Sequence, residues 1–142
     1  MGYTLEAIIG PAADVRRAVA GQPDAVIVPL HEDLVLVPMT EKLFAAFAGP
    51  EGGRAVKFET PGTVAYVEAE FFGGIGTQRA EIWTDGTLTF GPLEMDEGET
   101  VEVTPISQVL AKLGVKRKDR RDEFDVVELD RHRGTEGWLS QV

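Results

Sequence analysis

Between residues 62 and 91 the sequence switches repeatedly between β-strand patterns and turns, which leaves few folds open to the chain. The segment "GTVAYVEAEFF" (62–72) alternates, with one face formed by Tyr66, Glu68 and Glu70 and the other by Val67, Ala69 and Phe71. The segment 77–84 also alternates, and Asp85-Gly86 before "TLTFG" is typical of a type I′ hairpin turn. The pattern predicts an antiparallel meander of strands 62–72, 77–84 and 87–91.

Shorter patterns predict the remaining elements. We expect a strand over 3–9, a buried hairpin of 24–30 and 33–39, and a short strand within 54–60. Capping residues and stop signals predict three helices, which run from Pro11 to Gly21, from Thr40 to Gly49-Pro50, and from Thr104 to Gly114. The pattern of 116–133 does not decide between strand and helix. Together these elements predict a single α+β domain over 1–142, with a mostly antiparallel sheet and about three helices packed on it.

Composition restricts the class of protein and its partners. The formal net charge of -10 disfavours general nucleic-acid binding. The acidic excess lies in residues 1–111, with 17 acids against 6 bases, and would attract a basic protein partner. No apolar run is long enough to cross a membrane, and the basic start of a signal peptide is missing. With no cysteine either, we expect a cytoplasmic protein.

The glycine-rich segment "FFGGIGTQRA" is the first candidate site. Gly73, Gly74 and Gly76 match neither the dinucleotide-binding fingerprint nor a P-loop, because a strand pattern rather than a helix follows them. One interpretation is a hairpin loop in which glycine permits positive φ angles. The alternative is a loop whose exposed backbone amides bind a ligand or partner, with Gln78 as a polar neighbour.

Three glutamates form the second candidate site. Glu68 and Glu70 share a face of one strand, and Glu81 on the next strand lies across from them if the two strands pair. Such carboxylates are suited to binding a divalent cation or to dividing acid and base roles. A solvated strand face, with Arg79 neutralising one glutamate, explains the same pattern. They are therefore weak metal candidates, and we predict no cofactor.

The C-terminal segment "RHRGTEGW" is the third candidate site. Its guanidinium, imidazole, carboxylate and indole groups are suited to recognition of an anion or a partner, and they belong to Arg131, His132, Arg133, Glu136 and Trp138. No serine lies in a nucleophile elbow, so we assign no catalytic residue.

The chain shows one resemblance, which covers roughly residues 64–142. The stretch "YVEAEFFGGIGTQRAEIW", the following "GPL" and the terminal "RHRGTEGWL" resemble a group of bacterial proteins of unknown activity, chiefly actinobacterial. The resemblance implies no activity. Small acidic proteins of this kind are similar in broad character to immunity proteins of bacterial toxin systems, a likeness that transfers no site residue.

Three functions follow from these observations. The first is a non-catalytic protein that binds a basic partner, in the manner of an immunity protein. The alternatives are a small-molecule or nucleotide-binding module that uses the 73–78 loop, and a metal-assisted hydrolase that uses Glu68, Glu70 and Glu81. A common concavity lined by 73–78 and 131–138 would favour ligand binding, and separate positions would favour partner binding. The sequence leaves the oligomeric state open.

Overall fold

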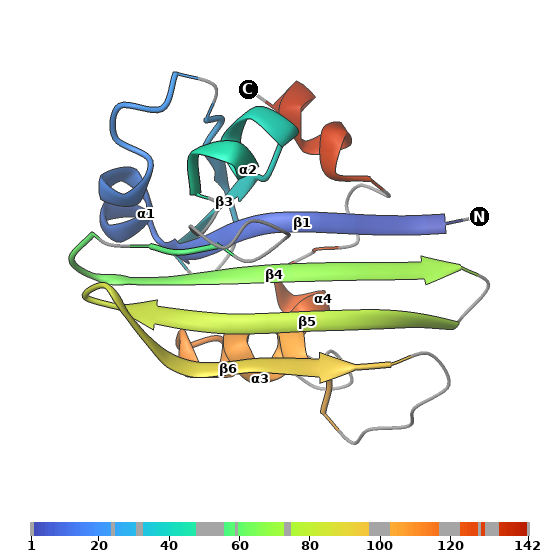
Figure 1. Ribbon diagram of the computed structural model, residues 1–142. Coiled ribbons are helices and arrows are strands. Elements are labelled where there is room, and N and C mark those ends of the chain that lie inside the picture. The colour runs from blue at the N-terminus through green and yellow to red at the C-terminus, as the bar shows by residue number, and fades with distance from the viewer. Residues whose placement is uncertain are drawn as a thin grey trace.

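The computed structural model describes residues 2–23, 25–30, 33–47, 56–58, 60–72, 75–96, 103–116, 123–127, 129 and 134–141. They contain one antiparallel six-stranded sheet with the strand order β2-β3-β1-β4-β5-β6 (Figure 1). The strands are β1 (Gly2–Pro11), β2 (Val28–Pro29), β3 (Leu34–Pro38), β4 (Thr63–Phe72), β5 (Ile75–Thr84) and β6 (Thr87–Met95). The predicted α+β class is confirmed.

The meander is confirmed, and two of its strands are longer than expected. β4 pairs with β5 from Thr63↔Thr84 to Phe72↔Ile75, so β5 begins two residues before the predicted start. The turn at Asp85-Gly86 has positive φ angles at both residues, as a type I′ turn requires. β6 continues beyond residue 91 because the register with β5 shifts on either side of Ile82, and such a bulge lets an edge strand accommodate Pro92.

Helices cover both faces of the sheet. They are α1 (Ala12–Ala18), α2 (Glu41–Phe47), α3 (Pro105–Lys112), α4 (Glu123–Val126) and the 3-10 helix η2 (Thr135–Gln141). The predicted caps are present, since Thr104 Oγ1 accepts a hydrogen bond from Ser107 N and Thr40 Oγ1 accepts one from Leu43 N. The predicted start of the first helix at Pro11 was wrong, because Pro11 is the last residue of β1 and α1 begins after it.

The predicted hairpin of 24–30 and 33–39 is present, although β2 is only two residues long. Val56 makes an isolated strand bridge within the predicted 54–60 strand, of which residues 54, 55 and 59 lie outside the described residues. In the undecided segment 116–133, the described residues include the short helix α4. None of the helices in the described ranges is long and apolar enough to cross a membrane.

Two apolar clusters lie on opposite faces of the sheet. The first packs α3, α4 and the C-terminal segment against one face, with Leu5, Val67, Ile106 and Trp138 among its members. In Figure 1, α3 lies behind β5 and β6. The second cluster packs α1 and α2 against the other face, with Ile8 of β1 and Tyr66 of β4 at its centre.

On the sheet face that carries α1 and α2, the buried apolar side chains extend along only part of β1 and β4. Along β4 the buried Tyr66 is followed on the same face by Glu68. Along β1 the buried Ile8 is preceded on that face by Glu6. Because side chains alternate along a strand, this change from apolar to acidic leaves half of the sheet face polar and open.

Candidate binding groove

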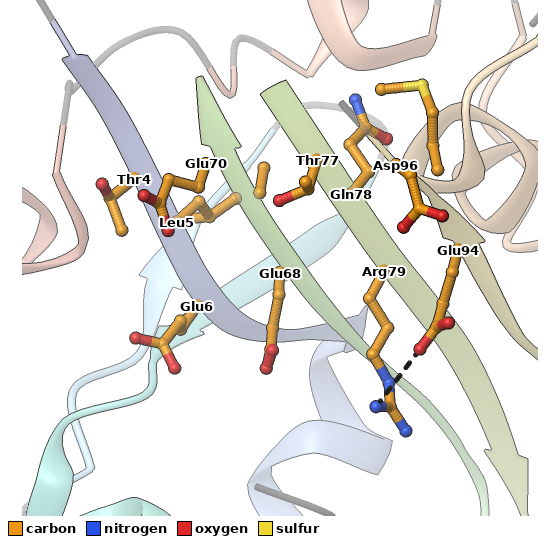
Figure 2. Close-up of a pocket in the computed structure, with 12 residues that line it drawn as sticks. Thr4, Leu5, Glu6, Glu68, Glu70, Thr77, Gln78, Arg79, Glu94 and Asp96 are labelled. Carbon is orange, nitrogen blue, oxygen red and sulfur yellow. Dashed lines mark ion pairs between the residues drawn. The ribbon is translucent and has the colours of Figure 1, made fainter. Parts of the chain in front are cut away.

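The open half of this sheet face contains a hollow of about 490 Å³. Residues of β1, β4, β5 and β6 form its floor, and Figure 2 shows their side chains. Its polar lining residues, which together form what we call the acidic groove, are Thr4, Glu6, Glu68, Glu70, Thr77, Gln78, Arg79, Glu94 and Asp96. Five carboxylates and one guanidinium in this lining make the groove strongly negative.

Strand register explains how residues so distant in the sequence meet. Glu6 lies opposite Glu68, Glu68 lies opposite Arg79, and Arg79 lies opposite Glu94. These four side chains therefore form one row across β1, β4, β5 and β6. Side chains opposite each other on paired strands have Cβ atoms about 5 Å apart, and like charges so placed repel each other. The Glu6–Glu68 pair is such a contact, and it adds to the negative charge of the groove.

Arg79 is already engaged by two carboxylates. Its Nε lies 3.6 Å from Glu81 Oε1, and its terminal nitrogen lies 3.5 Å from Glu94 Oε1. The side chain is 33% exposed. These ion pairs direct the guanidinium toward β6, as Figure 2 shows for Glu94. The part of the groove over β1 and β4 is therefore dominated by carboxylates.

Glu81 lies beside the groove, on the same face of the sheet as Arg79, and is not part of its lining. Its carboxylate is buried, and Glu81 Oε2 accepts a hydrogen bond of 2.7 Å from Trp83 Nε1. Burial raises the pKa of the Glu81 carboxyl, because desolvation disfavours the charged form more than Trp83 and Arg79 favour it. The charge of Glu68 adds to the increase in this pKa. Glu81 therefore helps to hold Arg79 in position through their ion pair.

A pH dependence of stability follows from the raised pKa of Glu81. The native carboxyl binds a proton more tightly than the unfolded one, so its ionisation lowers the free energy of unfolding at neutral pH. The free energy of unfolding increases again as the pH falls through the raised native pKa, because the Glu81 carboxyl becomes protonated. Glu81→Gln carries no charge and lacks this dependence. We expect the free energy of unfolding of the wild type, minus that of Glu81→Gln, to increase on acidification from neutral pH toward the ordinary pKa of 4.5. Urea denaturation at a series of pH values measures this difference. A difference that decreases on acidification contradicts the raised pKa of Glu81.

The structure gives Gln78 and Gly76 structural roles. Gln78 is buried, and its Oε1 accepts a hydrogen bond of 3.0 Å from Ile106 N at the start of α3. Gly76 lies in β5 rather than in a loop, and a Cβ there would collide with the Phe71 ring and the Glu70 carbonyl. The glycine is therefore required by packing at this position. Gly73 and Gly74 lie outside the described residues.

The C-terminal candidate residues do not line the groove where the structure describes them. Trp138 has no exposed surface and belongs to the cluster under α3. Arg131, His132 and Arg133 lie outside the described residues, as does the side chain of Glu136. Of the described residues of 73–78 and 131–138, Thr77 and Gln78 line the hollow and those of 131–138 do not.

The C-terminal segment instead lies beside the first half of β1. The Glu6 backbone N–H donates a 2.9 Å hydrogen bond to Thr135 Oγ1, and the Tyr3 hydroxyl donates one of 2.7 Å to the Leu129 carbonyl. The register between β1 and β3 begins only at Ala7. The C-terminal segment therefore lies along the part of β1 that β3 does not pair with. Its hydrogen bond to the backbone N–H of Glu6 fixes that residue.

The three predicted glutamates are separated by burial. Glu68 and Glu70 line the groove on one face, as predicted, whereas Glu81 lies opposite Tyr66 and is buried. Among the residues that the structure describes, no group of three or more His, Asp or Glu side chains is arranged to hold a metal ion.

Three of the five carboxylates of the groove were missed in the sequence. Glu6, Glu94 and Asp96 were not singled out as site residues. The signal for Glu6 was present, because it is the one charge in the apolar run of the first strand. The position of Glu6 beside Glu68 was not predictable, since the pairing of β1 with β4 joins segments about 60 residues apart.

Comparison with known proteins gives no independent assignment of family. No family model, no curated protein and no solved structure matches the chain. The resemblance drawn from the sequence stays a prediction, and functional inference depends on the geometry of the groove.

Proposed function

We propose that the protein is a non-catalytic binding protein whose acidic groove takes up a lysine- or arginine-rich segment of a partner protein. One observation carries the proposal: five carboxylates, from β1, β4, β6 and the residue after β6, line a hollow of about 490 Å³. Among the described residues that line it there is a single base, already engaged by Glu81 and Glu94. A basic toxin, as in an immunity system, is one partner of this class. We place the interaction in the cytoplasm.

The charge and rigidity of the groove support this class of ligand. A nucleotide phosphate or other anion would be repelled by the carboxylates, so the groove disfavours the small-molecule alternative in its nucleotide form. The floor consists of paired strands, and side chains on a sheet are held in position better than side chains on loops. Complementary charge accelerates association and selects partners, and its effect weakens as salt screens it.

The test is calorimetric titration with a short lysine-rich peptide, capped at both ends to remove terminal charges. We expect binding that weakens as the salt concentration rises. Neutralising two central carboxylates, with Glu6→Gln and Glu68→Gln, should weaken binding about tenfold, since each partly exposed ion pair contributes up to about 1 kcal/mol.

The matched control removes two negative charges elsewhere. Asp33 and Asp85 do not line the groove, and both have positive φ angles, which asparagine also tolerates. The amide introduced by Asp85→Asn would also keep an acceptor for Gly62 N, which now donates to Asp85 Oδ1. We expect Asp33→Asn with Asp85→Asn to bind the peptide like the wild type. Equal weakening in both double variants, or no binding at low salt, overturns the proposal.

A further inference from the structure

A second, smaller hollow adjoins the acidic groove. Its volume is about 150 Å³, several times the ~30 Å³ share of one water molecule. Its lining consists of Glu6, Met39, Thr40, Glu41 and Phe44, and we call it the apolar notch after Met39 and Phe44. Glu6 lines both hollows, so the notch continues the groove past β1 to the start of α2.

Backbone hydrogen bonds fix the walls of the notch. Met39 N donates to the Glu6 carbonyl at 2.8 Å, which ties the end of β3 to β1. Phe44 N donates to the Thr40 carbonyl at 2.7 Å in the first turn of α2. With Thr135 Oγ1 accepting from Glu6 N, the backbone of Glu6 is held through both its N–H and its carbonyl. These hydrogen bonds therefore hold the walls of the notch in place.

An aromatic contact connects the notch with the groove. The half-buried Phe44 ring packs edge-on against Tyr66, with 6.3 Å between the ring centroids. The Tyr66 hydroxyl donates a hydrogen bond of 3.2 Å to Glu68 Oε1. An apolar wall at Phe44 and the carboxylate pair of Glu6 and Glu68 thus belong to one packed unit.

We propose that the partner segment carries an apolar side chain two residues from a basic one, with the apolar side chain in the notch and the base at Glu6 and Glu68. This inference rests on the proposed function and names the chemistry of its partner. In an extended segment, residues i and i+2 point the same way and lie about 7 Å apart. Glu6 and Glu41 border the notch, so charge complementarity favours a basic segment over a neutral one.

The two hollows then have different roles in recognition. Carboxylates in the groove attract and orient a basic segment, but many basic segments would satisfy them equally. An apolar side chain buried in a fitted pocket is the usual source of a binding hot spot, and it distinguishes one sequence from another. The notch therefore determines which basic partner is bound.

The test compares capped peptides of alternating lysine and serine that end in Leu, Phe or Ala two residues beyond the last lysine. A second set places this residue before the first lysine, since either chain direction is possible. We expect the Leu or Phe peptide of one set to bind about tenfold more tightly than the Ala peptide of equal charge. The ratio should persist at high salt, because burial of apolar surface is not screened.

Two protein variants test whether the preference for the Leu or Phe peptide depends on the notch. Phe44→Ala should remove the preference, so that the Leu, Phe and Ala peptides bind this variant with equal affinity. The control is Leu88→Ala, which truncates an apolar side chain that is 38% exposed and lies on β6 away from the notch, and it should keep the preference. Thermal unfolding checks that Phe44→Ala is folded, and the comparison of peptides on the wild type does not depend on that variant.

The outcomes separate this inference from the proposed function. Equal binding of the Leu, Phe and Ala peptides in both sets overturns the apolar anchor and leaves the basic partner in place. Absence of binding by every peptide at low salt overturns both. Self-association of the wild type that Phe44→Ala abolishes, measured by light scattering, overturns the inference by showing that a second copy fills the notch.

Discussion

Reversing two charges at the centre of the acidic groove, with Glu6→Lys and Glu68→Lys, is expected to lower the affinity for a lysine-rich peptide by about 100-fold or more. The two carboxylates lie opposite each other on β1 and β4, and both line the groove. Their replacement removes two attractions and adds two repulsions at one point. Calorimetry at low salt measures the loss.

The control for this reversal makes the same change in net charge outside the groove. Asp33→Asn, Asp85→Asn, Thr87→Lys and Ala111→Lys together match the double reversal, and none of these positions lines either hollow. We expect this variant to retain most of the affinity, because only long-range attraction is reduced. A loss as large as that of the double reversal would mean that overall charge, and no particular site, determines binding.

Trp138→Ala is expected to lower the free energy of unfolding by about 3–5 kcal/mol, the cost of removing a buried aromatic side chain and leaving a cavity. Trp138 has no exposed surface and shares its cluster with Leu5 of β1 and Ile106 of α3. Truncation would therefore loosen the C-terminal segment from the face that α3 covers. Urea denaturation followed by circular dichroism measures the change.

Leu88→Ala is the control for the loss of Trp138, since an exposed apolar side chain contributes little to stability. Its substitution should change the free energy of unfolding by less than about 0.5 kcal/mol. A change below about 1 kcal/mol for Trp138→Ala would contradict the buried position of the indole.

Local patterns predicted the elements well. Alternation along 62–72 and the Asp85-Gly86 turn require only neighbouring residues, and the meander is present. Thr104 and Pro105 start α3 as expected for the same reason. The third strand of the meander was predicted to end at residue 91, which is too early. A bulge in its pairing with β5 allows β6 to continue to Met95. A bulge depends on the partner strand, and the sequence of one strand does not show it.

The groove depends on contacts that no local pattern contains. Strand order places Glu6 of β1 beside Glu68 of β4, and the longer β6 brings Glu94 beside Arg79. The polar residues before Trp138 in the sequence led us to place it among the recognition residues, but its large apolar indole lies in the core. Gly76 likewise suggested a loop, although its role is to make room for Phe71.

The most direct test of the acidic groove is to map backbone amide chemical shifts during titration with a capped lysine-rich peptide. The groove predicts shifts concentrated on four strand segments, 4–6, 68–70, 77–79 and 94–96, which diminish as the salt concentration rises. A capped glutamate-rich peptide should produce none of them. Shifts centred on α3 or on Asp33 and Asp85, or no shifts at low salt, would contradict the assignment of the groove as the binding site.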